Sequence, residues 1–284
     1  MRCRHTSHLL VLLVASIVAA GLAGAPATLP DQEGSLKFAV IGDSGTGGPA
    51  QYRVAKALAD ARRSFHYELV LMLGDNLYIG SDREDYRKAF EIPYKPMLDA
   101  GVRFYAALGN HDDPKERFYK GFNMNGERYY SFRPQPGVRI FALDSNAMDR
   151  AQLDWFEKAL ADSGSDWKIC FFHHPLYSSA GRHGSDLALR AQVEPLLLKY
   201  GVDVVFAGHD HVYERIKPQK GIYYFVSGGA AKLRKGDIEA SALTAKAFDT
   251  GNHFMLVELA GGVLSFEAIS DTGAVVDSGS FTLR

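Results

Sequence analysis

Five apolar runs in this chain each lead into a short polar turn, and this repeated pattern restricts the fold more than any other feature of the sequence. The runs have the length and composition of strands, and helix-like segments separate most of them. Continuous apolar strands that alternate with helices are typical of a buried, largely parallel sheet, so we expect an α/β fold. The turns are Gly42-Asp43-Ser44-Gly45, Gly74-Asp75-Asn76-Leu77-Tyr78, Gly109-Asn110-His111-Asp112, His173-His174-Pro175 and Gly208-His209-Asp210-His211.

The expected elements change in character along the chain. Strands are expected at 36–41, 69–73, 102–108, 140–143, 169–172 and 202–207, and helices at about 50–64, 83–99, 151–161 and 186–199. In the last third, strand-like runs at 221–227, 253–259, 263–269 and 275–283 have no confident helix between them. Gly261-Gly262 and Asp271-Thr272-Gly273 indicate hairpin turns. We therefore expect a mixed α/β core with additional antiparallel strands.

The first residues are typical of a signal peptide. Arg2 and Arg4 precede an apolar run from Leu9 to Leu22, and small residues follow it. We expect a leader over residues 1–27 rather than a membrane anchor, because the apolar run is short for a membrane span. The length of the remaining chain suits one large α/β domain over 28–284 better than two small ones. The remaining chain has one cysteine, Cys170, and no Asn-x-Ser/Thr acceptor. These features favour an exported protein, periplasmic or secreted, without internal disulfides.

The overall charge argues against two classes of partner. The formal net charge is −1, so the chain has no basic excess for binding nucleic acid or an anionic membrane surface. Any phosphate group that the protein binds must therefore be held locally, by a metal ion or by a shaped loop.

The polar turns have the composition of a metal site. Ligands of α/β sheets gather outside the carboxyl ends of strands, so all five turns can meet at one edge. His209 and His211 are two residues apart in an extended segment and can face the same site, whereas the adjacent His173 and His174 are expected to point to opposite sides. Carboxylate, amide and imidazole ligands suit hard or borderline metal ions. His66 and the second Gly-Asn-His, at 251–253, are interpreted as structural.

In sequence, the turns resemble those of the purple acid phosphatases, within the calcineurin-like metallophosphoesterases. The family pattern GDxG, GDxxY, GNH(D/E), xxxH and GHxH is matched in order by GDSG, GDNLY, GNHD, CFFH and GHDH. The small mammalian-type, tartrate-resistant branch is most similar, through GDNLYIG and HHPLYSSAGRHG, and the resemblance covers about 36–230. It implies a four-layer αββα sandwich of two mixed β-sheets flanked by helices.

The resemblance also implies roles for individual residues. Asp75 would bridge two metal ions, and His173 is preferred to His174 because the family ligand stands two residues before the proline. His111 and His183 would contact the substrate and help to protonate the leaving group. Asp43, Tyr78 and His211 would bind Fe(III), and Asn110, His173 and His209 would bind a divalent ion of iron, zinc or manganese.

The implied activity is an acid phosphatase that hydrolyses phosphate monoesters by attack of a metal-bound hydroxide, so the implied partner is a small phosphorylated substrate. A phosphodiesterase or nucleotidase using the same site is the first alternative, and an exported metal- or phosphate-binding protein without turnover is a more distant one. The short 144–155 segment does not support activation by proteolysis, which relatives undergo at a long loop there. Gly42-Asp43-Ser44-Gly45 also matches the nucleophile loop of trypsin-like proteases, but in those enzymes a histidine base and an aspartate precede the serine, and little but the expected leader lies upstream of it here.

Overall fold

Strand β1 (Leu36–Ile41) is buried on both faces, and its alternating side chains establish the layers of the fold. Phe38 and Val40 point into the core between two sheets, where Phe38 meets Phe206 of the opposite sheet edge-on at 6.1 Å. Ala39 and Ile41 point the other way, into a core shared with helix α1 (Pro49–Ala61). Successive residues of a strand face opposite sides, so one strand contributes to two hydrophobic layers.

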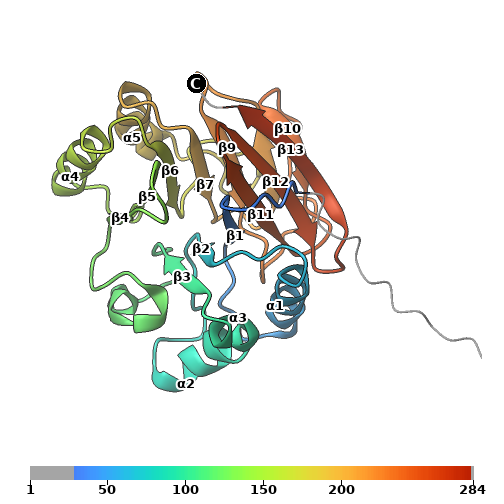
Figure 1. The fold of residues 1–284 in the computed structure, drawn as a ribbon. Coiled ribbons are helices and arrows are strands. Elements are labelled where there is room, and N and C mark those ends of the chain that lie inside the picture. The colour runs from blue at the N-terminus through green and yellow to red at the C-terminus, as the bar shows by residue number, and fades with distance from the viewer. Residues whose placement is uncertain (1–28, 283–284) are drawn as a thin grey trace, which may run out of the picture.

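The computed structural model describes residues 29–282, in which two mixed sheets pack between two layers of helices (Figure 1). The predicted leader, residues 1–27, lies outside the described residues. Helices α4 (Arg150–Ala161) and α5 (Leu187–Lys199) cover one sheet, and α1 covers the other. The four-layer αββα fold expected from the sequence is confirmed.

The first sheet has the order β13-β12-β11-β1-β2-β3. Its strands β1, β2 and β3 run parallel, and the three C-terminal strands add an antiparallel half through the predicted hairpins. The remaining bounds are β2 Leu69–Met72, β3 Arg103–Ala106, β11 His253–Ala260, β12 Val263–Ser270 and β13 Val275–Thr282.

The second sheet has the order β10-β8-β9-β7-β6-β5-β4. Strands β5, β6, β7 and β9 are parallel, and the edges are antiparallel. Its bounds are β4 Tyr130–Phe132, β5 Val138–Ala142, β6 Trp167–Phe172, β7 Val204–Ala207, β8 Tyr213–Ile216, β9 Tyr223–Ser227 and β10 Thr244–Phe248. Cys170 of β6 is buried in the core beneath α4 and α5.

The predicted continuous helix at 83–99 is wrong. The segment consists of α2 (Arg83–Tyr86), a π-helical turn (Arg87–Glu91) and α3 (Lys95–Asp99). Pro93 and Pro96 lack the backbone N–H that a continuous helix needs, and Pro96 is instead accommodated in the first turn of α3.

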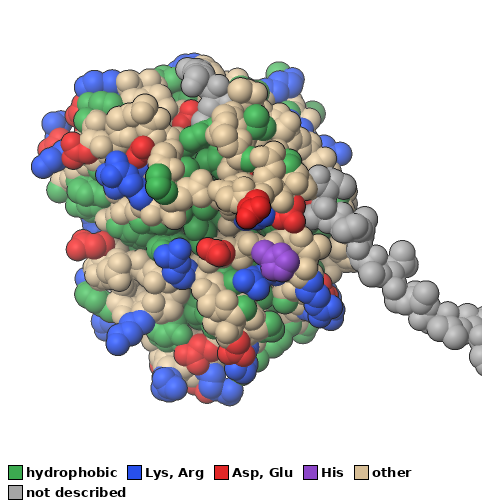
Figure 2. All heavy atoms as spheres, in the orientation of Figure 1, with side chains coloured by type: hydrophobic (Ala, Val, Ile, Leu, Met, Phe, Trp, Pro, Cys, Tyr) green, Lys and Arg blue, Asp and Glu red, His purple; other side chains and the backbone are tan. Residues whose placement is uncertain are grey.

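The surface agrees with the nearly neutral composition. On the face shown in Figure 2, positive and negative side chains are interspersed. Within residues 29–282, none of the helices combines the length and the apolar character that crossing a lipid bilayer requires.

His253 predicts an acid-sensitive step in stability. It is buried beside Tyr213, and burial lowers its pKa from about 6.5 to about 4. The unfolded chain therefore binds a proton between about pH 6.5 and pH 4 while the folded chain does not, so stability falls as the pH drops through this window. The difference reaches about 3 kcal/mol near pH 4. Urea unfolding of wild type and His253→Phe between pH 7 and pH 4 should show a shallower pH dependence for the variant; equal slopes would contradict the assignment.

Candidate metal centre

The five polar turns meet where parallel strands of the two sheets end. They follow β1, β2 and β3 in the first sheet and β6 and β7 in the second. Three of the turn residues adopt left-handed backbone conformations that are uncommon outside glycine: Asp43 (φ 56°), Asp75 (φ 52°) and His209 (φ 68°). Such conformations cost energy and persist where surrounding contacts enforce them. The surrounding contacts therefore hold three of the predicted metal ligands in strained backbone conformations, as is common at functional sites.

Glycine allows the turns to approach one another. Gly74 has a φ of +94°, and a Cβ atom there would lie 2.6 Å from Nδ1 of His173. A Cβ atom at Gly208 would lie 2.7 Å from Oδ2 of Asp43. Both residues border a turn from the opposite sheet, so any larger side chain would push the two halves of the site apart.

One group of predicted ligands surrounds Tyr78. Its hydroxyl donates to Oδ2 of Asp75 at 2.7 Å and lies 3.1 Å from Oδ1 of Asp43. Nε2 of His211 is 3.4 Å from the same hydroxyl and 3.3 Å from Oδ1 of Asp43. Asp43, Asp75, Tyr78 and His211 therefore present their ligand atoms to one small volume.

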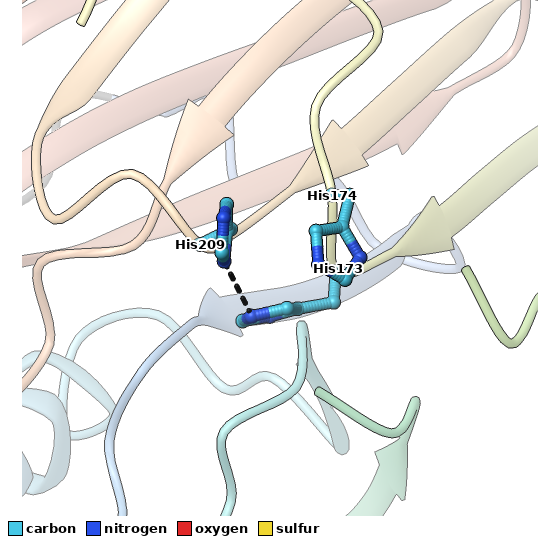
Figure 3. A group of neighbouring side chains, drawn as sticks. All are labelled: His173, His174 and His209. Carbon is cyan, nitrogen blue, oxygen red and sulfur yellow. Dashed lines mark hydrogen bonds between the residues drawn. The ribbon is translucent and has the colours of Figure 1, made fainter. Parts of the chain in front are cut away.

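A second group surrounds His173. Its Nδ1 lies 2.9 Å from the backbone oxygen of Leu73, so this nitrogen carries the proton and the Nε2 lone pair faces the site. Nε2 is 3.1 Å from Nδ1 of His209 (Figure 3), 3.0 Å from Oδ1 of Asn110 and 3.4 Å from Oδ1 of Asp75. Asp75 thus directs one carboxylate oxygen toward each group.

The buried acids of the site have no lysine or arginine partner among the described residues. Burial raises the pKa of Asp43 well above its ordinary value, and the Asp75 carboxylate adds to the shift although His173 opposes it. Within residues 29–282, no lysine or arginine forms an ion pair with either carboxylate. Burial also lowers the pKa of His209 to about 2, with neighbouring histidines contributing. Buried carboxylates beside neutral imidazoles fit bound metal cations, which neutralise the acids and use the nitrogen lone pairs.

His174 does not point away from the site. Its ring centroid lies 4.9 Å from that of His173 and 4.4 Å from that of His209, so the expectation of opposite directions is wrong (Figure 3). Strand β6 ends at Phe172, and strict alternation of side chains ends with it. Nδ1 of His174 lies 2.8 Å from Oγ of Ser145, which anchors the ring beside the predicted ligands.

The two predicted acids lie at exposed positions beside the ligands. The His111 ring is 4.9 Å from the Tyr78 ring, and the His183 ring is 4.3 Å from the His209 ring. The loop that carries His183 is held to a distant segment, because Gly181 donates its N–H to the backbone oxygen of Asp237 at 2.7 Å.

One supporting residue was quoted within a motif but given no role in the sequence analysis. The Asp112 carboxylate accepts from Asn76 Nδ2 at 2.7 Å, Gly109 N at 2.8 Å and Leu77 N at 3.0 Å. Its hydrogen bonds therefore connect the turn at residues 74–78 to the turn at residues 109–112. Burial raises its pKa to about 8, although these hydrogen bonds oppose the shift. The aspartate at the fourth position of the GNHD motif is the sequence feature that could have identified this supporting role.

Comparisons with known proteins agree with this arrangement. Residues 36–213 match the model of the family described as calcineurin-like phosphoesterase. Tartrate-resistant acid phosphatase type 5 of Oryctolagus cuniculus is 28% identical, with 70% of this chain and 75% of that protein covered. Purple acid phosphatase 17 of Arabidopsis thaliana is 26% identical, with 75% and 74% covered.

Solved structures share the fold. A purple acid phosphatase from yellow lupin seeds superposes with a TM-score of 0.72 at 21% identity, covering 89% of this chain and 55% of that chain. The anchor in the inner membrane complex of Plasmodium superposes with a TM-score of 0.74 at 18% identity, covering 88% and 89%. At these identities the similarity concerns the fold alone, and two proteins with quite different descriptions share it.

Proposed function

Because the chain belongs to the calcineurin-like phosphoesterase family, we propose that it is a dinuclear-metal acid phosphatase that hydrolyses phosphate monoesters. The observation that carries the proposal is the convergence of Asp43, Asp75, Tyr78, Asn110, His173, His209 and His211 from two sheets, with the two groups joined at Asp75. The acid phosphatases among the similar proteins support the monoester class.

The ligand groups suggest how two ions would be divided. Asp43, Tyr78 and His211 would hold Fe(III), and Asn110, His173 and His209 would hold a divalent iron, zinc or manganese ion. Asp75 would contact both, because its two oxygens face different groups. These residues would hold the two ions, which would supply an activated water nucleophile and neutralise charge on the phosphate oxygens.

The protein's own side chains would orient the substrate and move the proton. His111 and His183 border the ligands and are exposed, so a leaving-group oxygen can reach them. Asp112 keeps the Gly109–His111 turn against Asp75, whose Oδ1 also accepts from the His111 N–H at 3.0 Å. The rigid turns thus fix the acids relative to the ligands before substrate binds.

A direct assay tests the proposed function. Metal-loaded protein is expected to hydrolyse 4-nitrophenyl phosphate faster than bis(4-nitrophenyl) phosphate, and removal of metal by a chelator should abolish both rates. A preference for the diester would favour the phosphodiesterase alternative. Stoichiometric metal binding without turnover of any phosphate ester would favour a binding protein.

His183→Ala is expected to have a substrate-dependent effect. General acid catalysis contributes roughly 100- to 10,000-fold, and a poor leaving group depends on it most. The variant should therefore lose far more kcat on an alkyl phosphate than on 4-nitrophenyl phosphate. His66→Ala, at an exposed position in another part of the chain, is the matched control and should affect neither substrate. Equal losses on both substrates would remove His183 from this role.

Export is the remaining part of the proposal. The basic head and apolar run of residues 1–27 support it. N-terminal sequencing of the protein recovered from outside the cytoplasm would test it, with cleavage near Ala27 as the expected result.

A further inference from the structure

A basic segment after β9 runs along the candidate metal centre. Ala230 donates its N–H to the backbone oxygen of Gly42 at 3.1 Å, and Arg234 donates its N–H to that of His211 at 3.0 Å. Residues 237–239 then contact the loop that carries His183, through Gly181 N to Asp237 O at 2.7 Å and Glu239 N to Ser179 O at 2.9 Å. The segment between these points, which we call the basic arm (residues 232–235), is therefore fixed at both ends.

Lys232 extends over a predicted metal ligand. Its Nζ lies 3.9 Å from the centroid of the Tyr78 ring, and the His111 ring lies 4.9 Å from that same ring. Lys232 is only partly exposed, and among residues 29–282 it forms no ion pair with a carboxylate. A partly desolvated ammonium group without a counter-ion is unfavourable unless an anion binds beside it.

Arg234 is the second cation of the arm. Its closest carboxylate among the described residues is that of Asp237, with Nη1 and Oδ2 3.9 Å apart, and Nη1 is buried without a hydrogen-bond partner. The Arg234 backbone N–H donates to the backbone oxygen of His211, so the arm keeps Arg234 beside the predicted ligands.

The described residues neutralise the charges of Lys232 and Arg234 only in part: Lys232 has no carboxylate partner among them, and Nη1 of Arg234 lies 3.9 Å from Oδ2 of Asp237. Both cations lie at one side of the candidate metal centre. An additional anion on the substrate would give both cations a partner.

Building on the proposed phosphatase function, we propose that Lys232 and Arg234 form a second anion subsite, which binds a phosphate or carboxylate group that the substrate carries close to the scissile phosphate. The preferred substrates are then phosphate monoesters with a second anionic group. Arg234 offers a planar fork of donors for that group, and Lys232 offers a point charge.

A binding experiment tests the subsite without turnover. Metal-loaded protein is titrated calorimetrically with 3-phosphonopropionate and with propylphosphonate, which differ only in a carboxylate in place of a methyl group. Wild type should bind the carboxylated ligand about tenfold more tightly, as one additional charge-assisted interaction predicts. Lys232→Met and Arg234→Met should each remove most of this preference. Lys235→Met, a change of the same charge at an exposed neighbour, should retain it.

A kinetic experiment identifies the second group. The carboxylate pair is 3-phosphoglycerate with glycerol 3-phosphate, and the phosphate pair is propane-1,3-diol bisphosphate with propyl phosphate. A higher kcat/KM of wild type for the doubly anionic member of either pair supports the subsite and identifies the group that it binds. Lys232→Met and Arg234→Met should lose this preference through a higher KM. The proposed subsite is overturned if wild type shows no preference for the doubly anionic compound in either kinetic pair and none in the phosphonate titration. Absence of all turnover with the phosphonate preference intact would instead reject the phosphatase function and keep the subsite.

Discussion

Asp75→Asn is expected to lower kcat/KM by roughly 1,000-fold or more and to release metal from the protein. In the structure Oδ2 of Asp75 accepts from the Tyr78 hydroxyl at 2.7 Å, and Oδ1 lies 3.4 Å from Nε2 of His173. An amide presents one oxygen and one NH₂ group, so it can face only one of the two ligand groups as an acceptor. The variant would also bring one negative charge fewer to the two cations.

The measurement combines metal analysis with kinetics and stability. Wild type is expected to hold two ions per chain and Asp75→Asn fewer, while Asp162→Asn, an exposed control, should match wild type. Without metal the substitution removes a buried charge beside Asp43, so metal-free Asp75→Asn should unfold at a temperature no lower than metal-free wild type. This comparison separates loss of metal from misfolding. Two ions and wild-type turnover in the variant would refute the bridging assignment.

The sequence predicts the site well where local backbone chemistry decides the structure. A glycine followed by an acid or amide after an apolar run identifies a turn at a strand's carboxyl end, and parallel strands bring such ends together. For this reason the positions of Asp43, Asp75 and Asn110 could be expected at one edge. His209 and His211 also lie at this site, although His209 has a left-handed backbone conformation and the segment is not an extended strand, so simple alternation does not explain their directions.

Features set by tertiary contacts could not be predicted in this way. The short edge strands β4 and β10 and the short inner strand β8 were missed, because pairing with a neighbour rather than an apolar run defines them. The direction of His174 depends on Ser145, 29 residues away. Lys232 and Arg234 carry no motif, and only the backbone contacts of the basic arm bring them to the site.

Tyr78→Phe is expected to abolish the visible colour of the iron-loaded protein. A phenolate bound to Fe(III) absorbs visible light by charge transfer, and Phe has no oxygen to bind. Burial raises the pKa of Tyr78 far above its ordinary value, and Asp43 and Asp75 raise it further. The hydroxyl is then a neutral donor to Asp75. Iron loading of wild type should therefore release a proton from Tyr78 that Tyr78→Phe cannot release.

Two measurements separate this result from simple loss of iron. Iron content and oxidation state are determined alongside the spectrum, because a colourless protein can also contain zinc or manganese. Tyr86→Phe, which changes an aromatic hydroxyl outside the ligand groups, should keep the band. Hydrolysis is expected to persist in Tyr78→Phe, since the phenolate is not required for attack and two divalent ions without it leave the same net charge. Wild-type protein with stoichiometric Fe(III) and no visible band would exclude Tyr78 as a ligand, and the site would then be that of a phosphoesterase without a phenolate.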